Sequence, residues 1–395
     1  MEVNEILVLL MFISFMGLLF TGIPVCYVLA GVGVIFTAIG YFSDIYLDTA
    51  TGLDFMTLGI VVNRLFKLMS NWVLVALPMF IFMGLMLDRS DVAKKMMFSM
   101  QKLLGPLPGG LAVTVTVIGV MLAASTGIIG ASVVLLGMLS LPAMLKENYD
   151  KRFAAGIVSS AGTLGILIPP SIMLVVMADV LSVSVGDLFM GALFPGLLLA
   201  AIYFIYIVSL GFLNKKIIPP ARKARIDKKI IWEIVKSTLP PFFLIIAVLG
   251  PIFMGMATPT EASGMGALGA VVLAALNKNL NFKVIKEVSE QTLQTTAFIF
   301  AIFIGATCFS LVLRELGGDE FIEKIITGFS LDPHGTLLLI LALVFLLGFF
   351  LDWIEITLII LPLVAPIISN MDFAMSSHNL SDASLLWFTV LVALT

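Results

Sequence analysis

The stretch Gly162-Thr163-Leu164-Gly165-Ile166-Leu167-Ile168-Pro169-Pro170-Ser171 interrupts an apolar run over residues 153–181. Two consecutive prolines remove two backbone donors and clash with the preceding turn, so a helix over this run has to break there. Inside a bilayer, irregular backbone is tolerated only where protein or a water-filled cavity satisfies it. If the chain spans a membrane, the stretch therefore predicts a broken helix that lines a cavity.

The composition indicates that the chain does span a membrane. Of the 395 residues, 60% are hydrophobic and 12% are charged, and the mean hydropathy is +1.14. Soluble globular chains carry about 25% charged residues, and so many apolar residues could not be hidden in a soluble core of this size. We therefore expect a polytopic integral membrane protein.

The residue inventory excludes several other classes. Two cysteines in apolar runs and two histidines are too few for a disulfide framework or a His-built metal centre. The dipeptide Gly-Lys does not occur, so there is no P-loop and no sign of direct ATP use. The net charge of −3 gives no reason to expect nucleic acid as a partner. The N-terminus has Glu2 and Glu5 but no Lys or Arg, which is wrong for a cleaved signal peptide, so we expect the first segment to stay in the membrane.

The first half of the chain predicts five crossings and one hairpin. A single helix over residues 6–42 would be about 55 Å long, nearly twice the hydrocarbon core, so the run has to fold at Gly22-Ile23-Pro24. In residues 109–145, two arms (111–123 and 133–145) are too short to span, which predicts a re-entrant helical hairpin. The predicted crossings are 6–22, 25–42, 72–88, the broken helix 153–181 and 188–213, and the amphipathic residues 51–71 are expected to lie along the interface.

The second half appears as an inverted copy of the first. Residues 214–236 carry eight basic side chains, which predicts a cytoplasmic linker. After it come predicted helices 238–257, 260–276 and 292–313, a second hairpin 335–368, and an apolar segment 385–395. An odd number of crossings before the linker turns the second half upside down. The N-terminus is then periplasmic, and most basic residues fall on the cytoplasmic side, as the positive-inside rule demands.

Sequence echoes in the same order support this reading. Gly17-Leu18-Leu19-Phe20-Thr21-Gly22 with Pro24 resembles Gly250-Pro251-Ile252-Phe253-Met254-Gly255 with Pro259. We therefore predict an all-α fold of two inverted-topology repeats, 1–213 and 237–395, with broken helices and two re-entrant hairpins. Inverted repeats with broken helices place the binding site near the bilayer midplane.

The first candidate site lies where the first hairpin tip faces the proline break. Hydroxyl and carbonyl oxygens suit a hard cation such as Na⁺, and helix N-termini suit a carboxylate. The structural alternative is that small residues here only let helices pack closely. The candidates are Ser125, Thr126, Gly127, Gly130, Ser132, Gly162, Thr163, Gly165, Pro169, Pro170 and Ser171. Among these, Na⁺ is expected at Ser125, Thr126, Gly162 and Thr163.

Two further candidates lie in the second half. Asp352, Trp353, Glu355 and Thr357 fall in the predicted tip of the second hairpin, residues 351–357, where acidic groups are costly and usually functional. A wet loop at the membrane surface is the alternative. In Thr258-Pro259-Thr260-Glu261, the acidic side chain is an ion ligand, a proton relay, a charge that favours the helix N-terminus, or a structural cap.

Several motifs together resemble the large permease subunit of TRAP (tripartite ATP-independent periplasmic) transporters. They are Leu77-Pro78-Met79-Phe80-Ile81-Phe82-Met83-Gly84, the stretch 162–171, Asp187-Leu188-Phe189 with Phe194-Pro195-Gly196, and Thr258-Pro259-Thr260-Glu261-Ala262. The resemblance covers essentially the whole chain. It implies Na⁺-driven uptake of a carboxylate across the bacterial inner membrane, delivery by a periplasmic binding protein, a smaller membrane subunit alongside, and an elevator-like motion.

The chain departs from the family pattern in two places. Ile128 and Ile129 stand in the first hairpin tip, where the family commonly has hydroxyls and glycine. The family's second half should also run on through a further Pro-Pro break, whereas this sequence stops at Thr395, so a truncated chain is expected.

Three other functions stay open on the sequence alone. They are a one-component Na⁺/organic-anion symporter or antiporter, an intramembrane hydrolase built on Asp352 and Glu355, and a membrane scaffold that transports nothing. Three-residue spacing is a weak signal for a catalytic pair, and paired helix breaks destabilise a protein that has no cavity to line. We therefore expect a transporter that is not an enzyme and needs no cofactor beyond a coupling ion.

Overall fold

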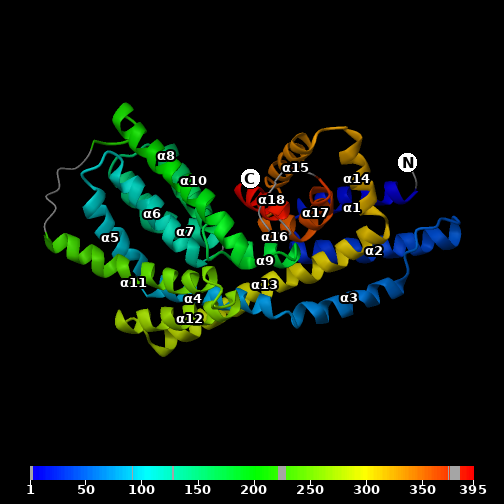
Figure 1. The fold of residues 1–395 in the computed structure, drawn as a ribbon, viewed down its shortest axis with the longest axis horizontal. Coiled ribbons are helices and arrows are strands. Elements are labelled where there is room, and N and C mark those ends of the chain that lie inside the picture. Colours follow the sequence, from blue (N-terminus) through cyan, green and yellow to red (C-terminus); the bar gives the residue numbers. More distant parts are fainter. Residues whose placement is uncertain (1–2, 91, 127–128, 221–227, 372, 374–382) are drawn as a thin grey trace.

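The computed structural model describes residues 3–90, 92–126, 129–220, 228–371, 373 and 383–395. The chain is all-helical there, which confirms the all-α part of the predicted fold class (Figure 1). Up to the basic linker the helices are α1 (Val3–Leu19), α2 (Val25–Tyr46), α3 (Phe55–Met69), η1 (Trp72–Val75), α4 (Ala76–Arg89), α5 (Val92–Leu104), α6 (Gly110–Thr126), α7 (Ile129–Lys146), α8 (Lys151–Leu167), α9 (Ile172–Val180) and α10 (Val185–Leu213). After the linker they are α11 (Lys228–Phe253), α12 (Pro259–Leu276), α13 (Phe282–Glu315), α14 (Gly318–Gly328), α15 (Pro333–Leu347), α16 (Trp353–Glu355), η2 (Ile356–Ile360), α17 (Leu361–Ser369) and α18 (Ala383–Leu394).

The long apolar helices match the predicted crossings. By length and composition, 5 of the described helices can cross a membrane, or up to 6 if α8 and α9 form one bent span. These are α2, η1 with α4, α10, α12 and α13, each at a predicted position. Helix α1 and the stretch Thr238–Phe253 of α11 are apolar but shorter. The chain is therefore a multi-pass membrane protein.

The proline break lies where the sequence predicts it. Helix α8 ends at Leu167, α9 begins at Ile172, and the two are bent by 45°. Because Pro169 and Pro170 have no N–H, the carbonyls of Gly165 and Ile166 lose their helical donors. The Ser171 hydroxyl donates to the Ile166 carbonyl. The Gly165 carbonyl is left without the partner that a continuous helix would supply.

Several helix pairs join the halves of the chain, and two of them pack closely at glycines. Helix α2 packs against α13, and α4 packs against α12 (Figure 1). Glycine allows the close approach: a Cβ on Gly305 of α13 would lie 2.5 Å from the Cys26 carbonyl oxygen of α2. A Cβ on Gly266 of α12 would lie 2.7 Å from the Met83 sulfur of α4. Small residues thus set both interfaces.

The two echoed glycine motifs have the same backbone role. Gly22 follows α1 with a φ of +80°, and Gly255 follows α11 with a φ of +68°. Both conformations are left-handed and suit glycine, which ends the preceding helix. In each case a proline then stands at the start of the next helix, as Pro24 before α2 and Pro259 in α12.

The first predicted hairpin consists of α6 and α7. These helices pack against each other, and both pack against α8. A Cβ on Gly119 of α6 would lie 2.7 Å from the Ala161 carbonyl oxygen, and one on Gly162 would collide with Val133 of α7. The two helical arms agree with the prediction. The loop between the two arms is shorter than predicted, however, because α6 continues through Thr126 and α7 begins at Ile129.

The second hairpin has its turn earlier than predicted. The chain turns over residues 348–352, and Asp352 is the N-cap of α16, its carboxylate accepting from the Trp353 N–H at 2.9 Å. The predicted tip over 351–357 is therefore wrong in its position. Glu355 and Thr357 lie in helix, the latter within the π-helical turn η2. Aspartate is a favoured N-cap, which explains why the helix begins directly after it.

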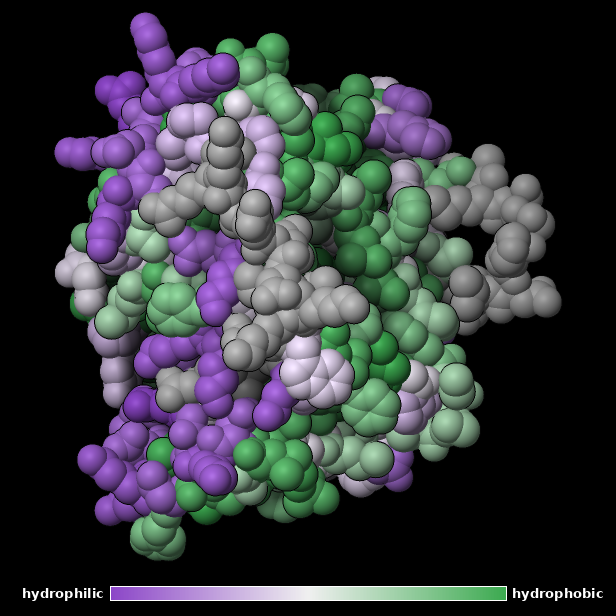
Figure 2. Space-filling model, turned by 90° about the vertical axis from the view of Figure 1, so that its left-hand side faces the viewer, coloured by the Kyte–Doolittle hydropathy of each residue, from purple (hydrophilic) through white to green (hydrophobic). Residues whose placement is uncertain are grey.

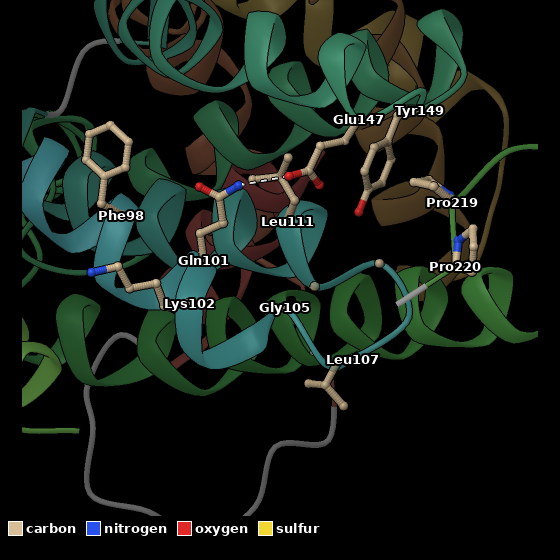
Figure 3. A pocket seen from close by; sticks show the side chains of 12 residues that line it. Phe98, Gln101, Lys102, Gly105, Leu107, Leu111, Glu147, Tyr149, Pro219 and Pro220 are labelled. Carbon is tan, nitrogen blue, oxygen red and sulfur yellow. Dashed lines mark hydrogen bonds between the residues drawn. The ribbon is translucent and has the colours of Figure 1, made fainter. Parts of the chain in front are cut away.

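Three loops that flank the first hairpin and the linker meet at one end of the molecule. A cavity of about 310 Å³ lies between Gln101, Gly109, Tyr149 and Pro219 (Figure 3). The Asp150 N–H donates to the Ile217 carbonyl at 3.0 Å, and the Gln101 amide donates to Glu147 at 3.1 Å. Figure 2 shows this end, with hydrophilic side chains gathered along one side of it and hydrophobic ones along the other. Both ends of the first hairpin thus lie beside the start of the linker.

Tyr149 is a buried member of this loop cluster. Burial and the nearby Glu147 carboxylate raise the pKa of its phenol to about 12, against the backbone N–H groups of Leu111 and Ala112. The phenol therefore stays neutral, and its ring packs where the first hairpin begins.

Candidate functional site

The broken helix and the second hairpin share one cavity. It has a volume of about 380 Å³, within the range of small-ligand sites. Thr163 and Leu167 of α8 line it, together with Asp352 and Trp353 of the second hairpin. Helices α8, α9, α16 and α18 meet near the centre of the molecule in Figure 1. Residues that are far apart in the sequence are thus brought to one hollow.

Thr163 presents an oxygen that can accept or coordinate. Its side chain is exposed, and its hydroxyl donates to the Ser160 carbonyl at 2.9 Å. A hydroxyl that donates its hydrogen bond to a backbone carbonyl still has two lone pairs with which to accept or coordinate. Its oxygen is therefore suited to a cation in the cavity or to a donor on a ligand.

Asp352 supplies a negative charge at the cavity. One carboxylate oxygen caps α16, and the residue as a whole is exposed. The positive end of the helix dipole stabilises this charge. The cap also holds the side chain in one place, at the mouth of the second hairpin's turn.

Glu355 lies one turn further along and is buried. Its side chain is 3% exposed, and its Oε2 has no hydrogen-bond partner among the described residues. The neighbouring Thr357 is also buried and donates to the Trp353 carbonyl at 2.7 Å. Neither residue lines the cavity, whereas Asp352 and Trp353 of the same motif do, so Asp352 supplies the motif's carboxylate there.

The other predicted residues of the proline break are buried in the packing. Pro169, Pro170 and Ser171 are buried, and Gly165 lies in the last turn of α8. Gly162 sits tightly against α7, which accounts for a glycine there by packing alone. Their roles as ligands stay predictions.

The first hairpin tip is described only in part. Gly127 lies outside the described residues, as do the side chains of Ser125 and Thr126, whose backbone forms the end of α6. Ser132 is buried near the start of α7. A role of the tip in ion binding stays a prediction.

The Thr258–Glu261 motif is a capping box. The Thr258 hydroxyl accepts from the Glu261 N–H, and the Glu261 carboxylate accepts from the Thr258 N–H at 2.8 Å. The Thr260 hydroxyl donates to the Trp72 carbonyl at 3.1 Å. These residues do not line the shared cavity. Of the alternatives for Glu261, the structural cap is the one that this geometry supports.

Tyr203 lines the cavity but is not among the site residues that the sequence predicts. It lies on α10 and lines the cavity together with Met173 and Met177 of α9. The available signal was a phenol inside an apolar crossing, but α10 has no break to draw attention to it. The C-terminal turn of α18, residues 392–395, also lines the cavity.

The donor set fits a hard cation better than a transition metal. Among the described residues there is no group of three or more His, Cys, Asp or Glu side chains placed to hold a metal ion. What the cavity offers is one carboxylate, hydroxyl oxygens and the edge of a helix break. Oxygen donors of this kind suit Na⁺, Ca²⁺ or Mg²⁺.

Comparison with known proteins gives a consistent answer. Residues 12–394 match the family "Tripartite ATP-independent periplasmic transporter, DctM component". The C4-dicarboxylate TRAP transporter large permease protein DctM of Rhodobacter capsulatus is 29% identical, over 91% of this chain and 81% of that protein. The Pseudomonas aeruginosa protein of the same name is 30% identical, over 77% and 70%. The sialic acid TRAP transporter large permease protein SiaM of Vibrio cholerae is 27% identical, over 90% and 80%.

The family match covers nearly the whole chain, including the proline break, the capping box and the second hairpin. The resemblance drawn from the motifs alone is confirmed. The chain belongs to the large permease (DctM) component of the tripartite ATP-independent periplasmic transporters.

Proposed function

We propose that this protein is the permease subunit of a Na⁺-coupled secondary transporter that imports a small organic carboxylate across the bacterial inner membrane. One observation carries the proposal: Thr163 beside the proline break and Asp352 at the second hairpin line one cavity. The family supports the coarser statement that the chain is a transporter permease rather than an enzyme.

The charge at Asp352 gives a physical reason for cation coupling. A carboxylate substrate that enters the cavity meets a carboxylate already there, and like charges at close range repel. A cation between the two removes that repulsion. Na⁺ takes oxygen ligands, which the Thr163 hydroxyl, the Gly165 carbonyl and the first hairpin tip at Ser125 and Thr126 would supply. Substrate affinity then depends on Na⁺, which is the requirement for symport.

Helix pairing supports the inverted-repeat architecture. The contacts of α2 with α13 and of α4 with α12 are what a two-fold axis would produce if it related α2 to α12 and α4 to α13. The left-handed glycines after α1 and α11 fit the same relation. In this architecture both hairpins are re-entrant from opposite sides, and the substrate site lies between their tips.

The side-chain contacts agree with the proposed topology. Arg89 pairs with Glu287 at 3.3 Å, both on the proposed cytoplasmic side. Lys324 pairs with Glu5 at 2.8 Å, both on the proposed periplasmic side. We propose a periplasmic N-terminus and a cytoplasmic location for residues 214–236, on the positive-inside rule. An elevator-like motion would carry the hairpins and the broken helix past the remaining helices.

The remaining parts of the transporter are proposed from the family. A small membrane subunit would pack against this chain, and a periplasmic binding protein would deliver the substrate. The names of the relatives above span C4-dicarboxylates and sialic acid, so the family alone does not select one carboxylate.

A one-component Na⁺/anion symporter is the alternative within transport. The deciding experiment reconstitutes the chain with its small subunit in proteoliposomes and measures uptake of a panel of radiolabelled carboxylates. Uptake that needs both an inward Na⁺ gradient and the soluble binding protein supports the proposal. Uptake without the binding protein favours the one-component symporter, and uptake unaffected by Na⁺ contradicts coupling.

A further inference from the structure

Two adjoining cavities lie outside the site described above, where α5 meets α11 and α12. The larger, of about 590 Å³, is lined by Lys95 and Lys102 of α5, Lys236 of α11 and Asn277 after α12. The smaller, of about 340 Å³, runs between α11 and α12 and is lined entirely by apolar residues. The two share Pro240 and Leu273 and so form one continuous groove. We call it the lysine groove.

The helix geometry explains why positive charges gather at one end of this groove. Lys95, Phe98, Ser99 and Lys102 follow the i, i+3, i+4, i+7 spacing, so they share one face of α5. Ser99 is buried, and the two lysines and Phe98 are exposed around it. The lysines therefore stand at the rim of the cavity while the helix face between them forms its wall.

Contacts between the helices hold this end in shape. The Lys95 ammonium donates to the Asn277 side chain at 3.1 Å, which joins α5 to the end of α12. Lys236 lies one turn before Pro240 on α11. Of the described residues that line the larger cavity, none is acidic. Its described lining therefore brings three lysine side chains together at one end of the groove.

The other end of the groove is apolar and open. Phe243 of α11 and Met265 and Leu268 of α12 line it with exposed fractions of 68%, 59% and 67%. Its floor lies where Leu244 packs over Gly269, because a Cβ on this glycine would collide with Leu244. The groove is thus an apolar channel along the exposed surface of two helices.

We propose that the lysine groove binds an anionic phospholipid, with the phosphate headgroup among Lys95, Lys102 and Lys236 and an acyl chain between α11 and α12. Charge complementarity selects this occupant: a basic pocket beside membrane helices on the cytoplasmic side attracts anionic headgroups. A soluble anion would make no use of the apolar continuation. An uncharged lipid would make no use of the lysines.

The bound lipid would connect parts that belong to different predicted units. Lys95 and Lys102 lie on the helix that leads into the first hairpin, and Lys236 lies at the end of the linker. The lipid would therefore hold the base of the hairpin to α11 and α12. This inference does not depend on the substrate or on Na⁺ coupling.

The test measures lipid retention by the purified full-length chain. The protein is equilibrated in mixed micelles with equal amounts of phosphatidylglycerol and phosphatidylethanolamine, and bound lipids are counted by native mass spectrometry. Wild-type protein should retain phosphatidylglycerol preferentially. The triple variant Lys95→Gln/Lys102→Gln/Lys236→Gln should lower this preference at least about tenfold. The control Lys94→Gln/Lys146→Gln/Lys151→Gln removes as many charges from outside the groove and should keep it.

A second pair of variants tests the acyl-chain end. Val272→Trp fills the apolar groove without touching a lysine and should also lower retention. Ile202→Trp, at a similarly exposed position on α10 that lines neither cavity, should not. A melting temperature for each variant shows that it is folded.

Three outcomes would overturn the proposal. The first is equal phosphatidylglycerol retention in wild type and the lysine triple variant. The second is full displacement of phosphatidylglycerol by inorganic phosphate, which would identify a soluble-anion site. The third is loss of the co-purified small membrane subunit from the triple variant with no change in bound lipid, which would identify a protein interface.

Discussion

Thr163 of α8 and Asp352 at the start of α16 line the same cavity, although one belongs to the first half of the chain and the other to the second. Each side chain is fixed by its own helix: the threonine hydroxyl donates to Ser160, and the aspartate caps α16. The two halves therefore present oxygen atoms at defined positions across one hollow.

Asp352→Asn should reduce uptake at least about tenfold without unfolding the protein. Asparagine caps helices as well as aspartate does, so α16 should keep its start while the cavity loses its charge. The measurement is uptake in proteoliposomes beside a melting curve in detergent. Asp332→Asn is the matched control, because Asp332 caps α15 in the same way but lies outside the cavity. Equal uptake in both variants would rule out a role for the charge.

Thr163→Val should raise the Na⁺ concentration needed for half-maximal uptake by roughly tenfold. The two side chains have nearly the same shape, but valine has no oxygen to donate to a cation, and one hydrogen-bond-sized interaction is worth about 1 kcal/mol or somewhat more. The measurement is uptake against external Na⁺. Thr307→Val is the control, since this threonine also donates to its own helix, at 2.7 Å to the Phe303 carbonyl, away from the cavity. An unchanged Na⁺ dependence in Thr163→Val would remove Thr163 from the ion site.

Gly305→Ala should destabilise the interface between α2 and α13 by about 1–3 kcal/mol. The new methyl group would lie 2.5 Å from the Cys26 carbonyl oxygen, and backbone cannot give way as a side chain can. The measurement is the melting temperature in detergent. Gly264→Ala on α12 has nothing within 4 Å of the new atom and should be neutral or stabilising, because alanine favours helix over glycine. If both variants melt alike, close packing at Gly305 is not what the glycine provides.

The sequence predicted most of the helices because hydropathy and breakers are local signals. The turn at Gly22 and Pro24, the break at Pro169 and Pro170, and the five long apolar helices all lie where composition and proline placed them. In a bilayer these signals are strong, since an unsatisfied backbone group is costly there.

The site was harder to predict because it depends on which residues meet in space. Tyr203 lines the cavity from a helix with no break, and no local pattern marks it. Thr357 sits in a π-helical turn and bonds to its own helix, although the sequence placed it at a hairpin tip. A shift of a few residues in the turn was enough to separate Asp352, at the cavity, from Glu355, in the packing.

Glu355→Gln separates the effect of the buried carboxyl group on transport from its effect on the stability of the fold. The side chain is 3% exposed, and within the described part of the chain its Oε2 has no hydrogen-bond partner. Burial of an unpaired charge is expensive, so the amide of the same shape should leave stability unchanged or raise it by about 1 kcal/mol or more. If the carboxyl group also serves transport, uptake should fall at least about tenfold in the same variant. Stability and activity would then change in opposite directions.

Glu290→Gln provides the matched control for this substitution. Glu290 is exposed and forms an i,i+4 pair with Lys286 at 3.8 Å, so its loss should change neither melting temperature nor uptake measurably. A large drop in the melting temperature of Glu355→Gln would show that the carboxyl group is held by partners and has a structural role. Normal uptake with raised stability would show that it has no role in transport, contrary to the expectation that a costly ionisable group in a membrane interior serves function.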